Sequence, residues 1–146
     1  MSAKKLLILG MGLQGKGALH DVLEHKTFAT VTVADFGPRF EAERAAYEAQ
    51  GVRTAAVDAN DTDSLRELVA AHDIVIELLP VDFAMKVGRL AAEAGTHLVS
   101  SMYYIGQSMT DPTIFAQLKR EMEDIDQLAR RNGATLLIAC GMDPGL

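Results

Sequence analysis

Cysteine is almost absent from the sequence. Cys140 is the single cysteine among 146 residues, so no disulfide can form within the chain. A chain without internal disulfides fits a reducing compartment, and we expect a cytoplasmic protein. Lys4 and Lys5 precede an apolar stretch, but three glycines soon interrupt it. The interrupted stretch does not resemble a signal peptide.

Positive charge is also scarce. The sequence has 14 lysine and arginine residues against 20 acidic residues, which gives a formal net charge of −6. Nucleic acids and anionic membranes are bound by basic surfaces, so we expect neither as the main partner. No apolar run is long enough to span a bilayer. The 4 histidines are scattered and share no metal-ligand spacing with Cys140, so no metal site is predicted.

The residues that are present form the pattern of a globular α/β chain. Apolar residues make up 49% of the sequence, and we expect residues 1–146 to form one domain. Strict alternation of short apolar strands with helices predicts a doubly wound parallel sheet, the Rossmann fold, with about six strands and helices on both faces. The expected strands are Leu6–Leu9, Val31–Asp35, Arg53–Val57, Ile74–Leu79, His97–Ser100 and Thr135–Ala139.

Glycines and capping residues mark the helix boundaries. A glycine stands between a helical segment and the next strand at Gly51, Gly95 and Gly133, where a left-handed helix end favours this residue. Helix starts are expected near Asp61 and Asp111. Two helical segments carry apolar stripes that we expect to face the sheet. The stripes are Ala84, Val87, Leu90, Ala91 and Ala94 in the first segment, and Ile114, Leu118, Met122, Ile125 and Leu128 in the second.

The most informative motif is a G-x-G-x-x-G turn directly after the first strand. Gly10 allows the tight turn, Gly12 lets the backbone approach a pyrophosphate, and Gly15 permits close helix packing. Leu13 and Gln14 complete the turn and are expected at the cofactor as well. The pyrophosphate would lie at the positive end of the helix that follows. The motif therefore predicts a dinucleotide site.

An acidic residue at the end of the second strand supports this interpretation. Asp35 lies 20 residues beyond Gly15, where a carboxylate can accept hydrogen bonds from an adenosine ribose. The alternative is that Asp35 caps the next helix, which Pro38 could open. Arg39 could pair with a 2′-phosphate, but Asp35 would repel that group. The sequence therefore favours NAD, with NADP as the alternative.

The other strand ends supply further candidates. Asp58 and Ala59 follow the third strand and could lie against the adenine edge, although Asp58 serves equally well as a turn residue. Glu77 is a carboxylate in an apolar strand, so it needs a partner such as Lys86 or a place at the cofactor. Cys140, at the end of the last strand, is expected to be a small buried filler. Leu79 and Pro80 follow the fourth strand, close to the expected nicotinamide ribose.

Three segments together resemble the saccharopine dehydrogenase family, which includes lysine 6-dehydrogenase-like enzymes. They are Asp73–Pro80, Glu93–Tyr104 and the closing Gly141–Leu146, which looks like the family's Gly-Leu-Asp-Pro-Gly signature. The resemblance covers essentially the whole chain. It implies an NAD- or NADP-dependent oxidoreductase that acts at a C–N bond of an amino acid or its imine adduct.

The resemblance also assigns residues to parts of the site. It implies that Gly10, Gly12 and Gly15 cradle the pyrophosphate, that Asp35 holds the ribose, and that Leu79, Pro80 and Ser101 line the nicotinamide side. On the substrate side it implies Tyr103, Asp143, Pro144 and Gly145. The segment Ile105–Asp124 is longer than the family's usual link, which puts the placement of Tyr103 in question.

The family's substrate domain would begin where this sequence stops, at Leu146. We therefore expect a cofactor-binding domain with little or no turnover alone, and a small amino-acid-type substrate for the complete enzyme. The alternative is a non-enzymatic module whose NAD occupancy regulates a partner. A homodimer is expected by analogy with the fold.

Overall fold

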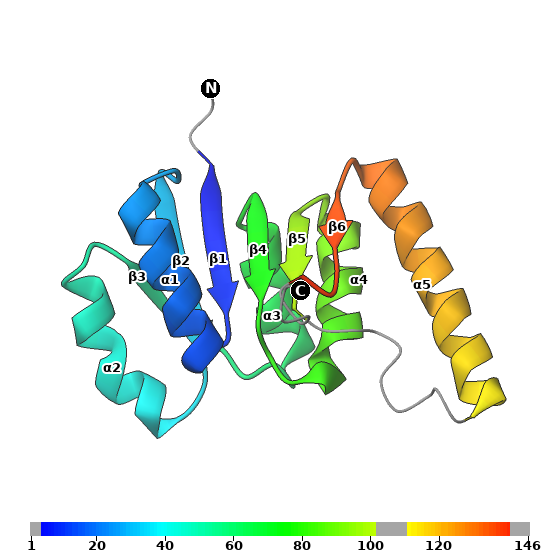
Figure 1. Cartoon of the computed structure of the whole chain (residues 1–146), viewed down its shortest axis with the longest axis horizontal. Helices are drawn as coiled ribbons and strands as arrows, with labels where there is room; N and C mark the ends of the chain where they lie inside the picture. The colour runs from blue at the N-terminus through cyan, green and yellow to red at the C-terminus, as the bar shows by residue number, and fades with distance from the viewer. Residues whose placement is uncertain (1–3, 102–110, 141–146) are drawn as a thin grey trace, which may run out of the picture.

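The sheet has six parallel strands in the order β3-β2-β1-β4-β5-β6 (Figure 1). The computed structural model describes residues 4–101 and 111–140. The strands are β1 (Lys5–Leu9), β2 (Thr30–Asp35), β3 (Arg53–Ala56), β4 (Ile74–Glu77), β5 (His97–Ser100) and β6 (Leu136–Leu137). The helices are α1 (Leu13–His25), α2 (Pro38–Glu48), α3 (Thr62–Ala70), the 3-10 turn η1 (Val81–Phe83), α4 (Ala84–Ala94) and α5 (Pro112–Asn132).

This arrangement confirms the predicted doubly wound parallel sheet. The strand order reverses between β1 and β4, which is the switch point where ligands bind in such sheets. The predicted fourth strand was too long, because the chain leaves the sheet after Glu77. The predicted last strand shrinks to the two residues that pair with β5.

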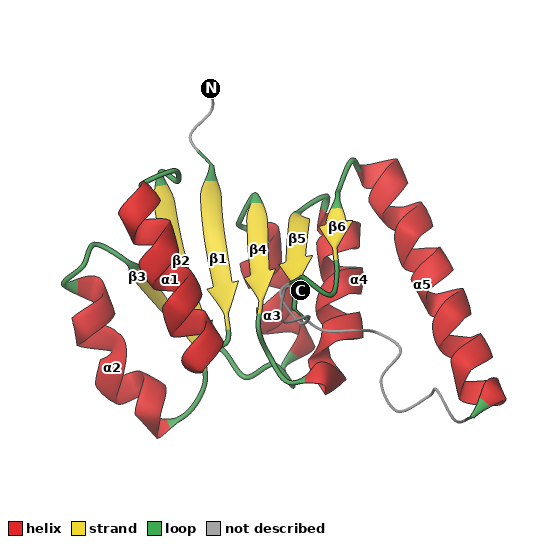
Figure 2. Cartoon of the chain, in the orientation of Figure 1, coloured by secondary structure: helices red, strands yellow, loops and turns green. Residues whose placement is uncertain are grey.

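Helices cover both faces of the sheet, as predicted (Figure 2). On one face Leu6, Ile8 and Val33 pack in a cluster with Leu19 of α1 and Phe40 of α2. On the other face the core joins the sheet to α3 and α4, and its members are Leu7, Leu9, Ala34, Ala59, Leu65, Val69, Val75, Leu79, Val87, Leu90, Ala91 and Leu98. Successive residues of β1 thus enter opposite cores, as the two-residue period of a strand requires.

The helix boundaries follow the predicted signals. The Asp61 side chain accepts a hydrogen bond from the Ser64 N–H at 3.2 Å and caps α3. Asp111 caps α5 in the same way, by accepting from the N–H of Thr113 at 2.8 Å. Gly95 ends α4 in the left-handed region, with φ 73°. These caps satisfy backbone groups that a helix leaves without internal partners.

One predicted stripe is only partly buried. Ile125 and Ala129 of α5 pack with Ala92 of α4, but Ile114, nearer the start of α5, is 45% exposed. Ala94 is also exposed. The prediction that both stripes face the sheet along their whole length is therefore wrong at Ala94 and at the start of α5. Helix α5 packs on α4, and only its C-terminal half reaches the core.

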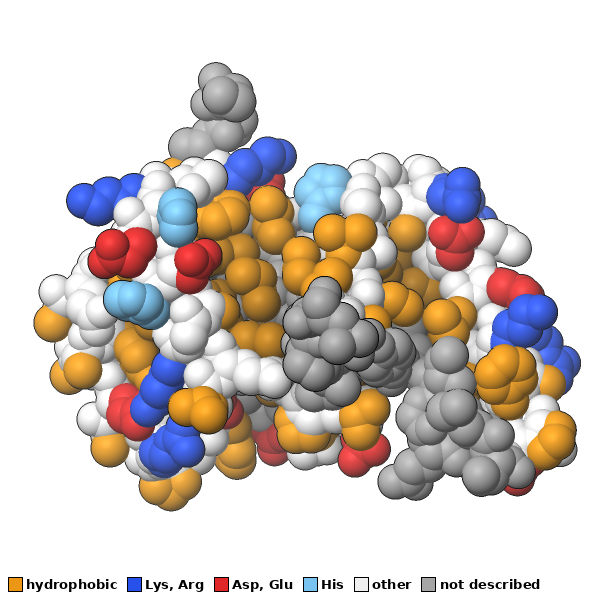
Figure 3. All heavy atoms as spheres, in the orientation of Figure 1, with side chains coloured by type: hydrophobic (Ala, Val, Ile, Leu, Met, Phe, Trp, Pro, Cys, Tyr) orange, Lys and Arg blue, Asp and Glu red, His pale blue; other side chains and the backbone are white. Residues whose placement is uncertain are grey.

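On the face of the sheet that α1 covers, the side chains of the strands beyond β1 are more exposed to solvent. The register aligns Ile76 with Val99, and Val99 with Leu137, so these three side chains share this face. Ile76 and Val99 are half-buried and Leu137 is 52% exposed. Figure 3 shows hydrophobic side chains on this face between α1 and α5. In the part of the chain that the structure describes, no helix is long and apolar enough to cross a membrane.

His72 follows α3 and joins this helix to β2, at the edge of the sheet where the strands begin. Its Nδ1 lies 2.8 Å from the Leu68 carbonyl and its Nε2 lies 2.8 Å from the Thr32 hydroxyl. A carbonyl only accepts, so Nδ1 carries the proton and Nε2 accepts from Thr32. Burial lowers the pKa of His72, although the bond to Leu68 opposes this shift. The fold therefore favours the neutral imidazole.

This preference predicts an acid-sensitive fold. The unfolded chain takes up a proton near pH 6.5, before the folded chain does, so it binds more protons below that pH. The contribution of His72 to stability is therefore fully present above about pH 6.5 and decreases as the pH falls toward the lowered pKa. Thermal unfolding between pH 8 and 5 measures this, with His72→Gln expected to flatten the dependence and the exposed His20→Gln expected to leave it unchanged. Equal pH profiles for wild type and His72→Gln would contradict the assignment.

Candidate functional site

The glycine turn between β1 and α1 is held tightly against the switch point. Gly10 has φ +92° and donates its N–H to the Ala34 carbonyl at 2.9 Å. A Cβ at Gly10 would lie 2.7 Å from the Leu78 carbonyl oxygen, and a Cβ at Gly15 would overlap the Gly10 carbonyl. Side chains at these two positions would displace the backbone. The turn therefore depends on both glycines, as the motif predicted.

The outer side of the same turn is open. Gly12 is the N-cap of α1, no side chain caps the helix, and a Cβ at Gly12 would meet no atom within 4 Å. Leu13 is 90% exposed and Gln14 is also exposed. The first N–H groups of a helix have no internal acceptor and carry a partial positive charge. This end of α1 can therefore accept an anionic group such as a pyrophosphate.

Asp35 lies beside this turn, at the end of β2. One carboxylate oxygen accepts a hydrogen bond from the Met11 N–H at 2.6 Å, and the other accepts from the Phe36 N–H at 2.7 Å. Helix α2 is capped by Gly37 without a side-chain bond, so the alternative prediction that Asp35 caps this helix is wrong. Each carboxylate oxygen has a further lone pair available. The group can therefore accept bonds from a ligand while holding the turn.

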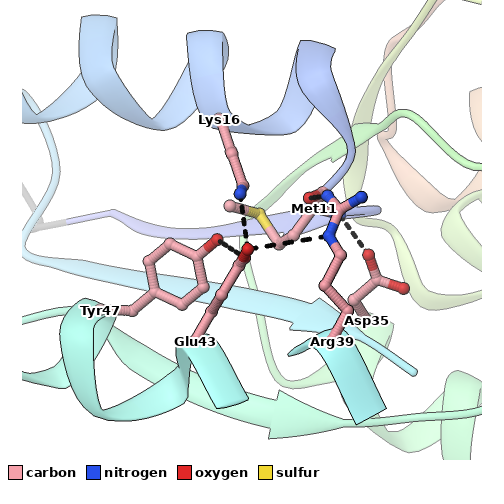
Figure 4. Close-up of polar contacts among 6 residues, drawn as sticks. All are labelled: Met11, Lys16, Asp35, Arg39, Glu43 and Tyr47. Atoms are coloured by element: carbon pink, nitrogen blue, oxygen red, sulfur yellow. Dashed lines mark hydrogen bonds and ion pairs between the residues drawn. The ribbon is translucent and has the colours of Figure 1, made fainter. Parts of the chain in front are cut away.

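Arg39 approaches the turn from α2 (Figure 4). Its Nη2 donates to the Met11 carbonyl at 3.0 Å, and its Nε lies 3.7 Å from an oxygen of Glu43. The same Glu43 oxygen is 2.7 Å from the Lys16 Nζ, and the other accepts from the Tyr47 hydroxyl at 2.8 Å. The Lys16 bond, with the Tyr47 bond, lowers the pKa of Glu43. Burial, with the same bond to Glu43, raises the pKa of Tyr47 to about 12.

These groups surround a hollow of about 280 Å³ at the ends of β1 and β2. The sequence predicted Gly12 and the segment from Asp35 to Arg39 here, which contains Phe36, but it missed Glu43. Phe36 is 65% exposed although it is a large aromatic residue, and it directly follows the acid. Its place after Asp35 was the available signal. Glu43 gave none, because its ion pairs depend on how α2 packs against α1. The lining is Met11, Gly12, Asp35, Phe36, Arg39, Phe40 and Glu43.

The candidates after β3, Asp58 and Ala59, do not line this hollow. Asp58 accepts bonds from the N–H and the side-chain amide of Asn60, each at 2.9 Å, so it has the turn role that the sequence allowed. Ala59 is buried, and its carbonyl accepts a bond from the Lys86 Nζ at 3.0 Å. No hydrogen bond joins Asp58 to the glycine turn within the described residues. Contact of either residue with adenine stays a prediction.

The ends of β4 and β5 face the glycine turn from the other side of the switch point. Ser101 is buried, donates its N–H to the Glu77 carbonyl at 3.4 Å, and places its hydroxyl 3.4 Å from Gln14 Oε1. Leu79 is buried and Pro80 is exposed. Of the three residues predicted for the nicotinamide side, Ser101 thus contacts the first turn of α1, and the Leu79 nitrogen would lie 3.2 Å from a Cβ at Gly10.

Glu77 does not pair with Lys86, so that prediction is wrong. One carboxylate oxygen accepts from the Leu79 N–H at 2.9 Å, and the other accepts from the Ser100 hydroxyl at 2.6 Å. Glu77 is fully buried, and burial raises its pKa although both hydrogen bonds oppose the shift. The Lys86 ammonium instead lies 5.6 Å from the centre of the Phe83 ring.

Two further predictions concern the last part of the chain. Cys140 is exposed, so the prediction of a buried filler is wrong: β6 ends at Leu137, and the Cys140 backbone N–H donates to the Ser100 carbonyl at 3.0 Å while its side chain faces solvent. The residues predicted for the substrate side lie outside the described residues: they are Tyr103, Asp143, Pro144 and Gly145. Over residues 4–101 and 111–140, no cluster of three metal-binding side chains occurs. The substrate-side prediction stays untested.

A larger hollow of about 550 Å³ lies along α5, at the other edge of the sheet. Phe115, Leu118 and Met122 line it. It arises because the N-terminal half of α5 has no covering element in the described structure. The hollow near Asp35 is smaller, but it combines open backbone donors with a carboxylate, which is the chemistry that a nucleotide requires.

A family comparison and a comparison with curated proteins both match this chain to saccharopine dehydrogenases and a related enzyme. The family described as "Saccharopine dehydrogenase NADP binding domain" matches residues 6–137. A similar curated protein is the saccharopine dehydrogenase [NADP(+), L-glutamate-forming] of Pyricularia oryzae, which is 27% identical over 146 residues. That match covers 100% of this chain and 29% of the relative. The alpha-aminoadipic semialdehyde synthase of Arabidopsis thaliana is 27% identical over 123 residues, which cover 84% of this chain and 10% of that protein.

Among solved structures, the chain resembles apo saccharopine dehydrogenase (L-Glu forming) from Saccharomyces cerevisiae. The TM-score is 0.70 and the identity is 26%, and the match covers 98% of this chain and 28% of that chain. The sequence therefore spans less than a third of the length of these relatives.

Proposed function

The chain belongs to the family of saccharopine dehydrogenase NADP-binding domains, and we propose that it holds a nicotinamide dinucleotide across the switch point of its sheet. The pyrophosphate lies on the first turn of α1, beside Gly12. The adenosine ribose lies at Asp35, and the nicotinamide half extends toward Leu79 and Ser101. This orientation follows the general rule that ligands bind at the carboxyl ends of parallel strands where the strand order reverses.

One observation carries this proposal. The Asp35 carboxylate is fixed on the Met11 N–H at 2.6 Å, directly beside the uncapped start of α1. An acceptor for sugar hydroxyls and donors for a diphosphate therefore stand next to one another. A carboxylate used only as a helix cap would point to α2, but α2 has no side-chain cap.

We further propose that NAD(H) is preferred to NADP(H), although the family name refers to NADP. The hollow beside Asp35 is lined by the acids Asp35 and Glu43, and the nearby cations are Arg39 and Lys16. Both cations already contact Glu43. A 2′-phosphate carries close to two negative charges and would meet Asp35 without a surplus of positive charge.

For the complete enzyme we propose an oxidoreductase that acts on a C–N bond of an amino acid or its imine. Hydride transfer requires the nicotinamide to be held against the substrate carbon with water excluded. The described residues supply the cofactor side of that arrangement. Its relatives are more than three times as long, and the remaining parts of such an enzyme would supply the substrate wall. We therefore expect binding with little or no turnover by residues 1–146 alone.

Calorimetric titration of the chain with NADH and with NADPH tests the proposal. We expect both titrations to show heat of binding, with NADH at least about tenfold tighter, because one favourable charge contact and one repulsive contact separate the two ligands. Absence of binding for both would overturn the proposed function. Tighter binding of NADPH would overturn only the cofactor preference.

A further inference from the structure

Glu77 occupies an unusual place for an acidic residue. It is the last residue of the central strand β4, and the register pairs it with Leu9 of β1 and with Ser100 of β5. Its side chain is fully buried. Removing a carboxyl group from water is costly, and an apolar side chain of similar size would avoid that cost. Glu77 therefore contributes something that an apolar residue cannot.

The contribution is geometric. One oxygen accepts from the N–H of Leu79, two residues further along the chain, and so fixes the direction in which the backbone leaves β4. The other oxygen accepts from the Ser100 hydroxyl on β5. The Glu77 carbonyl accepts from the Ser101 N–H at 3.4 Å. Glu77 thus joins the segment that follows β4 to the C-terminal end of β5.

The segment after β4 and the end of β5 also contact the glycine turn and the start of α1. The Leu78 carbonyl lies so close to Gly10 that a Cβ there would approach it to 2.7 Å. The Ser101 hydroxyl lies 3.4 Å from the side chain of Gln14, on the first turn of α1. A displacement of the segment after Glu77 would therefore alter the wall opposite Asp35 while leaving Asp35 and its bond to Met11 in place.

We propose that Glu77 is the positioning residue for the nicotinamide half of the cofactor: it joins Leu79 to Ser100 and so sets the wall against which the nicotinamide ribose and ring lie. The proposal depends on the proposed function, because it requires the dinucleotide to cross the switch point. It assigns to Glu77 no contact with the adenosine half. The residue acts through the backbone at Leu79 and through the end of β5.

Two substitutions separate this role from general stability. Glu77→Gln keeps an acceptor for the Leu79 N–H and gains a donor for the Ser100 hydroxyl, so both links persist. Glu77→Met fills a similar volume but removes both strong acceptors. The probes are NADH and ADP, which lacks both the nicotinamide and the ribose attached to it. Calorimetric titration measures the affinity of each variant for each probe, and thermal unfolding measures its stability.

We expect Glu77→Met to weaken NADH binding by at least about tenfold, because an unpaired buried N–H makes the segment rearrange. Its affinity for ADP should change by less than about twofold, because ADP has no group that lies against this wall. Glu77→Gln should bind both probes nearly as wild type does. A Glu77→Met protein that binds NADH normally, or that loses both ligands equally, would overturn the positioning role.

If Glu77→Met does not fold, NMR spectra of the wild-type protein still test the proposal. In nitrogen-15 NMR spectra, NADH should shift the Leu79 amide resonance and ADP should leave it in place. Equal shifts with both probes would overturn the inference. Failure of wild type to bind either probe would instead overturn the proposed function, so the two failures are distinguishable.

Discussion

Replacing Asp35 by asparagine is expected to abolish or reverse the preference for NADH over NADPH. The variant loses the negative charge that a 2′-phosphate would meet and the charge-assisted bonds that ribose hydroxyls would make. A hydrogen bond to a charged group contributes about 1.5–3 kcal/mol, so the ratio of the two affinities should shift by roughly 10- to 100-fold. Competitive titration of both cofactors against wild type and variant measures that ratio.

The substitution is a conservative one for the fold. An asparagine side chain retains an oxygen that can accept from the Met11 N–H, so the link between β2 and the glycine turn can persist. Asp21→Asn makes the same change in net charge on an exposed part of α1 and serves as the matched control. An unchanged ratio in Asp35→Asn, or an equal shift in Asp21→Asn, would contradict the placement of the ribose at Asp35.

The sequence was sufficient to predict the parts of the fold that depend on local signals. Apolar runs, Asp61 and Asp111 as caps, and glycines at helix ends all act within a few residues, and the structure confirms them. The position of Asp35 beside the glycine turn also followed from the pattern, because parallel strands bring their ends to one edge.

The failures concern relations between distant segments. The partner of Glu77 is Ser100, 23 residues away, and the β4–β5 register determines that pairing. A helical stripe shows which side of α5 is apolar, but it does not show whether another element covers Ile114. Cys140 was predicted to be buried at the end of the last strand, yet β6 pairs with β5 over only two residues. Packing partners and strand ends of this kind require coordinates.

Gly12 and Gly17 offer a matched pair for the claim on which the account depends. In each case an added Cβ would meet no atom within 4 Å, so Gly12→Ala and Gly17→Ala should both fold. Gly17 lies inside α1, where alanine should add up to about 1 kcal/mol of stability. Gly12 is the N-cap, where the new methyl group would occupy the space assigned to the pyrophosphate.

The most direct measurement is therefore a titration of both alanine variants with NADH, after thermal unfolding has shown that each is folded. Gly12→Ala should lose at least about tenfold in affinity, since a methyl group would separate the diphosphate from the backbone donors, whereas Gly17→Ala should bind as wild type does. A folded Gly12→Ala protein with undiminished affinity for NADH would contradict the placement of the dinucleotide on this turn.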